Sequence, residues 1–68
     1  MIIFDNLWIT MESKGITPYQ LRESCDFDRK TIRRLEENKN IETKTLNKIC
    51  AALSCKIEDI AEYKADES

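Results

Sequence analysis

Four positively charged side chains crowd one short stretch of this 68-residue chain, and their spacing is its strongest chemical signal. They are Arg29, Lys30, Arg33 and Arg34. On an α-helix, positions i, i+1, i+4 and i+5 fall on one side, so these residues form a continuous basic strip. Such a strip on a surface helix fits a groove lined with phosphates. The alternative is a solvated charged face, supported by Arg33 and Glu37 as an i, i+4 pair.

Polar side chains around this strip are candidates for contacts with phosphate groups. Thr17, Tyr19 and Lys39 belong to this set, and Lys44 is more remote. Thr31 is small and lies next to the strip, so we expect it to contact either a phosphate or a thymine methyl group. For the first three residues, simple surface polarity is the competing interpretation.

The cysteines do not form a recognisable metal or redox motif. Cys25, Cys50 and Cys55 are separated by 24 and 4 residues, and the chain has no histidine, which excludes a zinc knuckle and a CxxC pair. The sequence also has no nucleophile beside a base and no glycine loop for phosphates. We therefore expect no metal, cofactor, small-molecule ligand or enzymatic activity. Free thiols that fill the core in a reducing compartment are favoured over a redox switch.

Two short helices within residues 17–38, joined by a tight turn, are predicted to position the strip. The first begins where Thr17 can cap the free backbone N–H groups and Pro18 occupies the first helical position. Leu21 and Cys25 lie one turn apart on its inner face. Phe27 belongs to the turn and is expected to pack beneath both helices.

The second helix of the pair carries the strip itself. Asp28 repeats the start signal, Ile32 and Leu35 form the apolar stripe, and the helix is expected to end near Asn38, which tolerates a left-handed backbone. With so short a turn, the two helices must cross at a steep angle.

A helix over residues 6–14 is expected to precede this pair. Asp5 is its predicted N-cap, Phe4 and Ile9 are predicted to close over the cap as a hydrophobic staple, and Gly15 ends the helix. Residues 1–4 are apolar and β-prone but too short for a sheet on their own.

Two more helices are predicted after the pair, over residues 43–53 and 57–63, and the tail 64–68 is too polar to pack. The fold class is therefore an all-α, compact five-helix bundle. The expected core comprises Leu7, Met11, Ile16, Leu21, Cys25, Phe27, Ile32, Leu35, Ile41, Leu46, Ile49, Leu53, Ile57 and Ile60. The apolar residues left over are Ile2, Ile3, Ile9, Tyr19 and Tyr63, a surplus that predicts a self-association surface.

Length and charge limit the functions that the chain can have. Residues 1–68 suit a single domain of marginal size, with no membrane span or signal peptide core, so we expect a cytoplasmic protein. The net charge is −2, but residues 22–48 carry eight Lys or Arg against six acids, while both ends are acidic. Local positive charge suffices for a groove-binding surface, although non-specific affinity should be modest and salt-dependent.

The whole pattern resembles the lambda Cro and repressor family, the XRE-type helix-turn-helix DNA-binding domains. The resemblance covers about Leu7 to Ile60, with the helix-turn-helix at about 17–38. It is carried by Gly15-Ile16-Thr17, by the apolar positions around the turn, by Ile32, Leu35 and Glu36, and by the spacing of Leu46, Ile49, Cys50, Leu53, Ile57 and Ile60. It implies a lambda repressor-like fold in which Arg29, Lys30, Arg33 and Arg34 read base edges in the major groove.

Four positions depart from the family pattern. Pro18 stands where the family usually has a Gln that contacts the DNA backbone, so that contact is lost. Arg22 replaces a small Ala at the helix crossing and must extend past it. Asp26 replaces the turn Gly, which its tolerance of the left-handed region allows. Met11 falls where many members carry an Arg that pairs with the Glu matching Glu36.

The sequence therefore predicts a transcriptional regulator that binds a double-stranded DNA operator as a homodimer, over a roughly palindromic site. Because Arg can donate two hydrogen bonds to guanine O6 and N7, the half-site should contain G. The alternative is a protein-interaction or antitoxin-like module with the same fold, engaged through Trp8, Ile9 and the acidic last helix.

Overall fold

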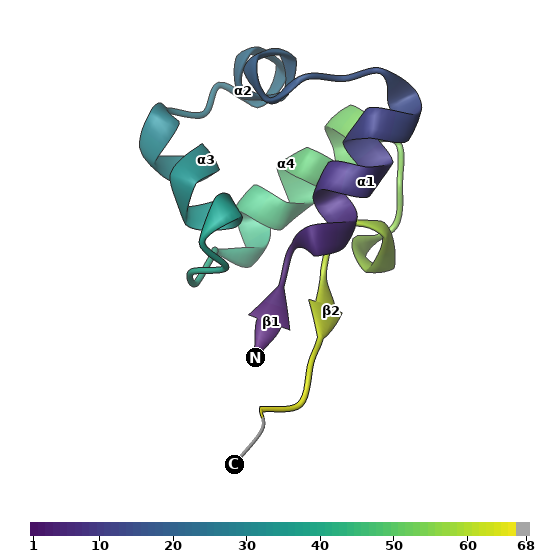
Figure 1. The fold of residues 1–68 in the computed structure, drawn as a ribbon. Coiled ribbons are helices and arrows are strands. Elements are labelled where there is room, and N and C mark those ends of the chain that lie inside the picture. The colour runs from purple at the N-terminus through teal and green to yellow at the C-terminus, as the bar shows by residue number, and fades with distance from the viewer. Residues whose placement is uncertain (67–68) are drawn as a thin grey trace.

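A computed structural model describes residues 1–66, and four α-helices, one 3₁₀ turn and a two-stranded sheet make up this part of the chain (Figure 1). In chain order the elements are β1 (Ile2–Ile3), α1 (Asp5–Lys14), α2 (Pro18–Cys25), α3 (Arg29–Glu36), α4 (Thr43–Leu53), η1 (Ile57–Asp59) and β2 (Glu62–Tyr63). Helix α4 crosses the middle of the molecule, with α3 on one side and η1 on the other. The predicted helical class and helix-turn-helix are confirmed.

Both predicted start signals of the helix pair are present. Thr17 Oγ1 accepts the N–H of Gln20 at 3.1 Å, and the N–H of Thr17 donates to Gln20 Oε1 at 2.9 Å, which forms a reciprocal capping box. Pro18 is the first residue of α2. Asp28 caps α3 by accepting the backbone N–H of Thr31 at 2.8 Å. These caps fix where each helix begins and therefore which residues face outward.

Left-handed residues end α1, α2 and α4 and follow the end of α3. They are Gly15 at φ 69°, Asp26 at 57°, Asn38 at 56° and Ser54 at 51°. Asp26 thus adopts the conformation that the family usually assigns to glycine, as predicted. After α3, the N–H of Lys39 donates to the carbonyl of Arg34 at 2.8 Å, closing the last turn.

The start of α1 differs from the prediction. Asp5 is the first residue of the helix rather than its N-cap, no side chain caps this end, and Ile9 is 65% exposed, so the predicted staple does not form. Phe4 occupies the cap position and is only 3% exposed. Its N–H donates instead to Asn38 Oδ1 at 2.8 Å. Burial of the Phe4 ring outweighs the local capping preference of Asp5.

The predicted fifth helix over residues 57–63 is wrong. One 3₁₀ turn, η1, is followed by β2, which pairs antiparallel with β1 in the register Ile2 with Tyr63 and Ile3 with Glu62. The N-terminal residues have unpaired backbone groups, and a strand satisfies them where a helix could not. Ile57 is consequently 51% exposed instead of buried.

The core otherwise follows the expected apolar pattern. Its buried residues are Ile3, Phe4, Leu7, Met11, Leu21, Cys25, Leu35, Ile49, Leu53 and Ile60. Ile3, predicted to be surplus, is therefore part of the core. Packed against it are Trp8, Ile16, Phe27, Ile32, Ile41, Leu46, Cys50, Cys55 and Ala61. In the tail, Asp66 pairs with the N-terminal amine of Met1 at 3.1 Å, while residues 67–68 lie outside the described part.

Candidate nucleic-acid interface

An apolar base fixes α3 to the rest of the molecule. Leu35 is fully buried on its inner face, and Ile32 is half-buried beside it. Leu21 and Cys25 of α2 belong to the same core cluster, and half-buried Phe27 packs against that cluster from the turn. The apolar side of α3 is thus anchored, so its opposite side must face solvent.

The first turn of α3 is held by one carboxylate. Asp28 Oδ1 accepts both the backbone N–H of Thr31 at 2.8 Å and its hydroxyl at 2.9 Å. These hydrogen bonds, the backbone one first, lower the pKa of Asp28 below its ordinary value of 3.8. Asp28 therefore stays ionised at neutral pH and keeps the cap closed.

The four basic side chains of α3 all lie at the surface, but they divide into two rows. Arg29 and Arg33 line one groove with residues of α2, whereas Lys30 and Arg34 line another with the start of α4. Arg29, Lys30 and Arg33 are exposed. Arg34 is half-buried, and its Nε and Nη2 donate to the backbone carbonyl of Asn40 at 3.3 and 2.7 Å.

No carboxylate within residues 1–66 forms an ion pair with any of these four cations. The Arg33 to Glu37 pair that would have supported a purely structural interpretation is not formed. Glu36 lines the α2–α3 groove, and Met11 is buried in the core. The charges of these four side chains are therefore not neutralised by a carboxylate of the described residues.

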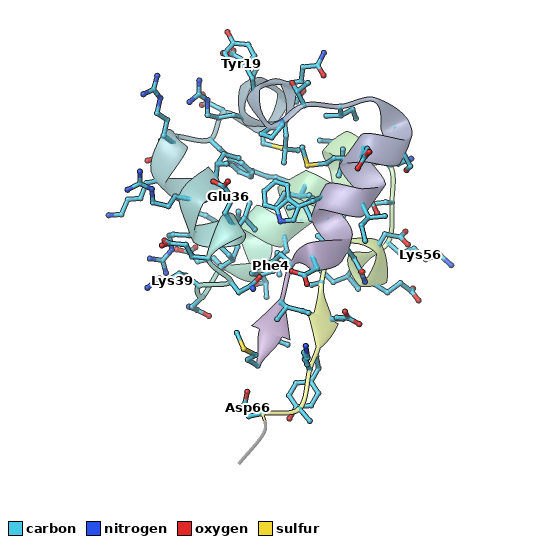
Figure 2. All side chains as sticks on the ribbon, in the orientation of Figure 1. Phe4, Tyr19, Glu36, Lys39, Lys56 and Asp66 are labelled. Carbon is cyan, nitrogen blue, oxygen red and sulfur yellow. The ribbon has the colours of Figure 1, made fainter. Side chains whose placement is uncertain are left out.

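The groove between α2 and α3 has a volume of about 290 Å³. It is lined by Pro18, Tyr19, Arg22, Arg29, Ile32, Arg33 and Glu36. Three guanidinium groups against one carboxylate make it electropositive. Tyr19 stands at the outer end of α2 and is 62% exposed (Figure 2). It is the one predicted phosphate-contacting residue that shares this groove with Arg29 and Arg33.

The other predicted phosphate contacts are more scattered. Thr31 lines the second groove with Lys30 and Arg34, but its hydroxyl hydrogen is already donated to Asp28. Thr17 caps α2 and lies beside a mostly apolar hollow of α1. Lys39 is exposed beyond the end of α3 (Figure 2).

Two contributions to this surface were missed from the sequence. Arg22 follows Tyr19 by one helical turn, its guanidinium carbon lies 5.4 Å from the centre of that ring, and it lines the basic groove. The i, i+3 spacing could have identified this pair. The second contribution is the hydrogen bond from Arg34 to the carbonyl of Asn40. Because the acceptor is a backbone group, no pattern of side chains in the sequence predicts this contact.

Cys25 and Cys55 line neither basic groove, and their thiols are protonated at neutral pH. Burial raises the pKa of Cys25, an effect that nearby Lys48 partly offsets, and burial also raises the pKa of Cys55, with a further increase from Cys50. Within residues 1–66, no three metal-ligating side chains gather at one place. No helix of this described part is long and apolar enough to cross a bilayer.

Comparison with known proteins agrees with this geometry. The family model of the Cro/C1-type HTH DNA-binding domain matches residues 6–66. A crystal structure of the transcriptional regulator VanUg is similar, with a TM-score of 0.85 at 28% sequence identity over 90% of this chain and 81% of that chain. The comparison with curated proteins gives no match. Because the family model spans nearly the whole sequence, this chain belongs to the Cro/C1-type helix-turn-helix DNA-binding domain family.

Proposed function

We propose that this chain is a sequence-specific transcriptional regulator that binds double-stranded DNA with α3 in the major groove. The observation that carries the proposal is the set of four cations on α3, three of them exposed and none paired with a described carboxylate. A rigid helix with free cations is the usual form of a major-groove reader. The family membership and the similarity to a transcriptional regulator support the same conclusion.

The two rows of cations differ in how they would contact the bases. Arg29, Lys30, Arg33 and Arg34 are the proposed base-reading residues. Arg29 and Arg33 have free guanidinium groups that can each donate two hydrogen bonds to a guanine. Arg34 is already oriented by the Asn40 carbonyl, which leaves its remaining N–H groups in a fixed direction.

Phosphate contacts are proposed for Thr17, Tyr19, Thr31 and Lys39. Arg22 adds a further cation beside Tyr19 and offsets the polar contact that Pro18 cannot make. Because the hydroxyl hydrogen of Thr31 is donated to Asp28, the alternative contact for Thr31 is between its methyl group and the methyl group of a thymine.

We further propose that the chain acts as a homodimer on a roughly palindromic operator. A single domain of this size contacts too little DNA for tight specific binding, whereas two copies related by a two-fold axis read two half-sites. The half-sites would lie about one helical turn, roughly 34 Å, apart.

The test is selection of bound duplexes from a randomised pool, followed by titration of the enriched duplex with variants. Arg29→Ala and Arg33→Ala should each weaken binding by about 1 to 3 kcal/mol, and repeated selection should lose the preference for G at one position. Lys56→Ala is the matched control, since it removes one cation far from α3 (Figure 2). An unenriched pool, or Arg variants that bind like the control, would contradict the proposal.

A second candidate function is protein interaction, for example as an antitoxin-like module. It is favoured by Ile9 and Ile57, which are 65% and 51% exposed on α1 and η1, two elements in contact. Capture of a specific protein by the wild type, lost in Ile9→Lys, together with duplex affinity that stays in the millimolar range, would favour this function over the first.

A further inference from the structure

Two of the three cysteines meet where α4 ends. The N–H of Cys55 donates to the carbonyl of Cys50 at 3.1 Å, and the N–H of Ser54 donates to the carbonyl of Ala51 at 3.4 Å. Ser54 has the left-handed backbone that ends α4, with φ 51° and ψ 50°. These two nested hydrogen bonds form a Schellman motif, in which the residues joined by the outer bond commonly pack their side chains together. Here those residues are Cys50 and Cys55.

A second observation supports contact between the two thiols. Burial raises the pKa of Cys55, and Cys50 raises it further, both as a neighbouring charge and as a hydrogen-bond partner of the thiol. A hydrogen bond between thiols requires neighbouring sulfur atoms. Both side chains are half-buried against the core, so small molecules can reach them, whereas Cys25 is buried. The sequence alone favours free thiols at these positions, because only the folded end of α4 brings the two together.

The backbone geometry is compatible with a covalent bond between them. A disulfide joins residues whose Cα atoms lie about 4.4 to 6.8 Å apart. Because the carbonyl oxygen of Cys50 and the nitrogen of Cys55 are 3.1 Å apart, standard bond lengths limit the separation of the two Cα atoms to about 7 Å. A disulfide can therefore form without moving α4 away from the segment that follows it.

We propose that Cys50 and Cys55 are a reversible modification site, which glutathione disulfide converts to an intrachain disulfide that stabilises the fold. One cysteine thiolate attacks a sulfur of glutathione disulfide, breaks its S–S bond and releases one glutathione. The other cysteine attacks the protein sulfur of this mixed disulfide and releases the second glutathione. The protein loses two electrons and two thiol protons, and glutathione disulfide gains them as two thiols. An excess of reduced glutathione reverses the reaction.

The bond would join two parts of the chain that both contribute to the core. Leu53 at the end of α4 and Ile60 after η1 are buried, and Cys55 lies between them. If the fold favours the disulfide over the two thiols by some factor, thermodynamic linkage requires the disulfide to favour the fold by the same factor. A domain of marginal size would gain noticeably from this contribution. The proposal does not depend on DNA binding.

The test measures the thiol–disulfide equilibrium of the full chain in glutathione buffers, with and without concentrated urea. Free thiols are trapped by alkylation, and peptide mass spectrometry identifies the linked residues. We expect a link between Cys50 and Cys55, with an equilibrium constant at least about tenfold larger in the folded chain than in urea. Because equilibria are compared, the scarcity of Cys55 thiolate at neutral pH slows the measurement without changing its result. Cys25→Ala is the matched control, which removes one thiol, keeps the pair and should give the same ratio.

Thermal melts of the oxidised and reduced wild type provide the linked measurement. A tenfold preference corresponds to a melting temperature about 5 to 10 °C higher in the oxidised chain. Cys50→Ser and Cys55→Ser should melt at the same temperature in oxidised and reduced glutathione.

Three outcomes would overturn the proposal: equal equilibrium constants in the folded chain and in urea, a link to Cys25, or glutathione adducts without an intrachain bond. Duplex binding by the reduced chain is measured separately, and its failure counts against the DNA-binding proposal alone.

Discussion

Arg34 differs from the other cations of α3 because its direction is set by its own chain. Two guanidinium nitrogens donate to the carbonyl of Asn40, and the side chain is half-buried as a result. A side chain that is already ordered loses less conformational entropy when it binds DNA. In the proposed complex, Arg29, Lys30 and Arg33 would become ordered only on contact with DNA.

We expect Arg34→Lys to weaken duplex binding several-fold even though the charge is kept, because a lysine ammonium cannot make the same forked contact with Asn40. The slope of log affinity against log salt should be nearly unchanged in this variant and in Arg34→Ala, because Arg34 is proposed to contact a base rather than a phosphate. Fluorescence anisotropy titrations at several salt concentrations give both quantities. Lys30→Arg is the control, and equal affinities of wild type and Arg34→Lys would contradict the argument.

At the scale of single elements, the helices were the most predictable part of the molecule. Thr17, Pro18 and Asp28 specify their helix starts through local hydrogen bonds, and local chemistry is visible in a sequence. Asp5 carried the same type of signal and failed, because the burial of its neighbour Phe4 is a tertiary effect. Capping signals are therefore dependable only where no buried side chain competes for the position.

The cap of α3 should make part of the stability depend on pH. The pKa of Asp28 is lower in the folded chain than its ordinary value of 3.8, so its contribution is complete above that value and disappears as pH falls through the lower, folded one. Asp28→Asn keeps an acceptor but does not titrate. The difference in melting temperature between wild type and Asp28→Asn should therefore shrink from pH 7 to pH 2.

Circular dichroism melts measure this difference. Glu23→Gln serves as the control for the loss of one negative charge at a site without a capping role. If the difference in melting temperature between the wild type and Asp28→Asn were the same at pH 7 and pH 2, ionisation of Asp28 would not contribute to the stability of the cap.

At the scale of the whole molecule, the two chain ends were the least predictable part. Residues 1–4 were expected to be too short for a sheet, and residues 57–63 were expected to be helical. In the structure, β1 from the first segment and β2 from the second pair with each other. Pairing over more than fifty residues leaves no local pattern. The positions of Arg29 and Arg33 on α3 could be predicted, whereas the Asn40 contact and the pairing of β1 with β2 could not.

A side-chain hydrogen bond links the residue after β1 to the segment after α3, which provides a test of long-range coupling. Asn38 follows the end of α3 in a left-handed conformation and accepts the N–H of Phe4 at 2.8 Å. Asn38→Gly keeps the backbone freedom but leaves this N–H without its partner, so the free energy of unfolding should fall by about 1 kcal/mol. Asn38→Asp keeps the acceptor and should lose less. Urea denaturation measures the free energy of unfolding of both variants. If Asn38→Gly were as stable as the wild type, the hydrogen bond would make no contribution to stability.

The separation of charge along the chain has a consequence for the approach to a target. Cations gather on α3, while Glu58 and Asp59 lie on η1, on the far side of α4, and Glu62 lies in β2 (Figure 1). A molecule with this electrical asymmetry is rotated by the field of a polyanion during diffusion, so it arrives in the productive orientation despite its net repulsion. Ionic strength would then change chiefly the association rate constant, and much less the dissociation rate constant.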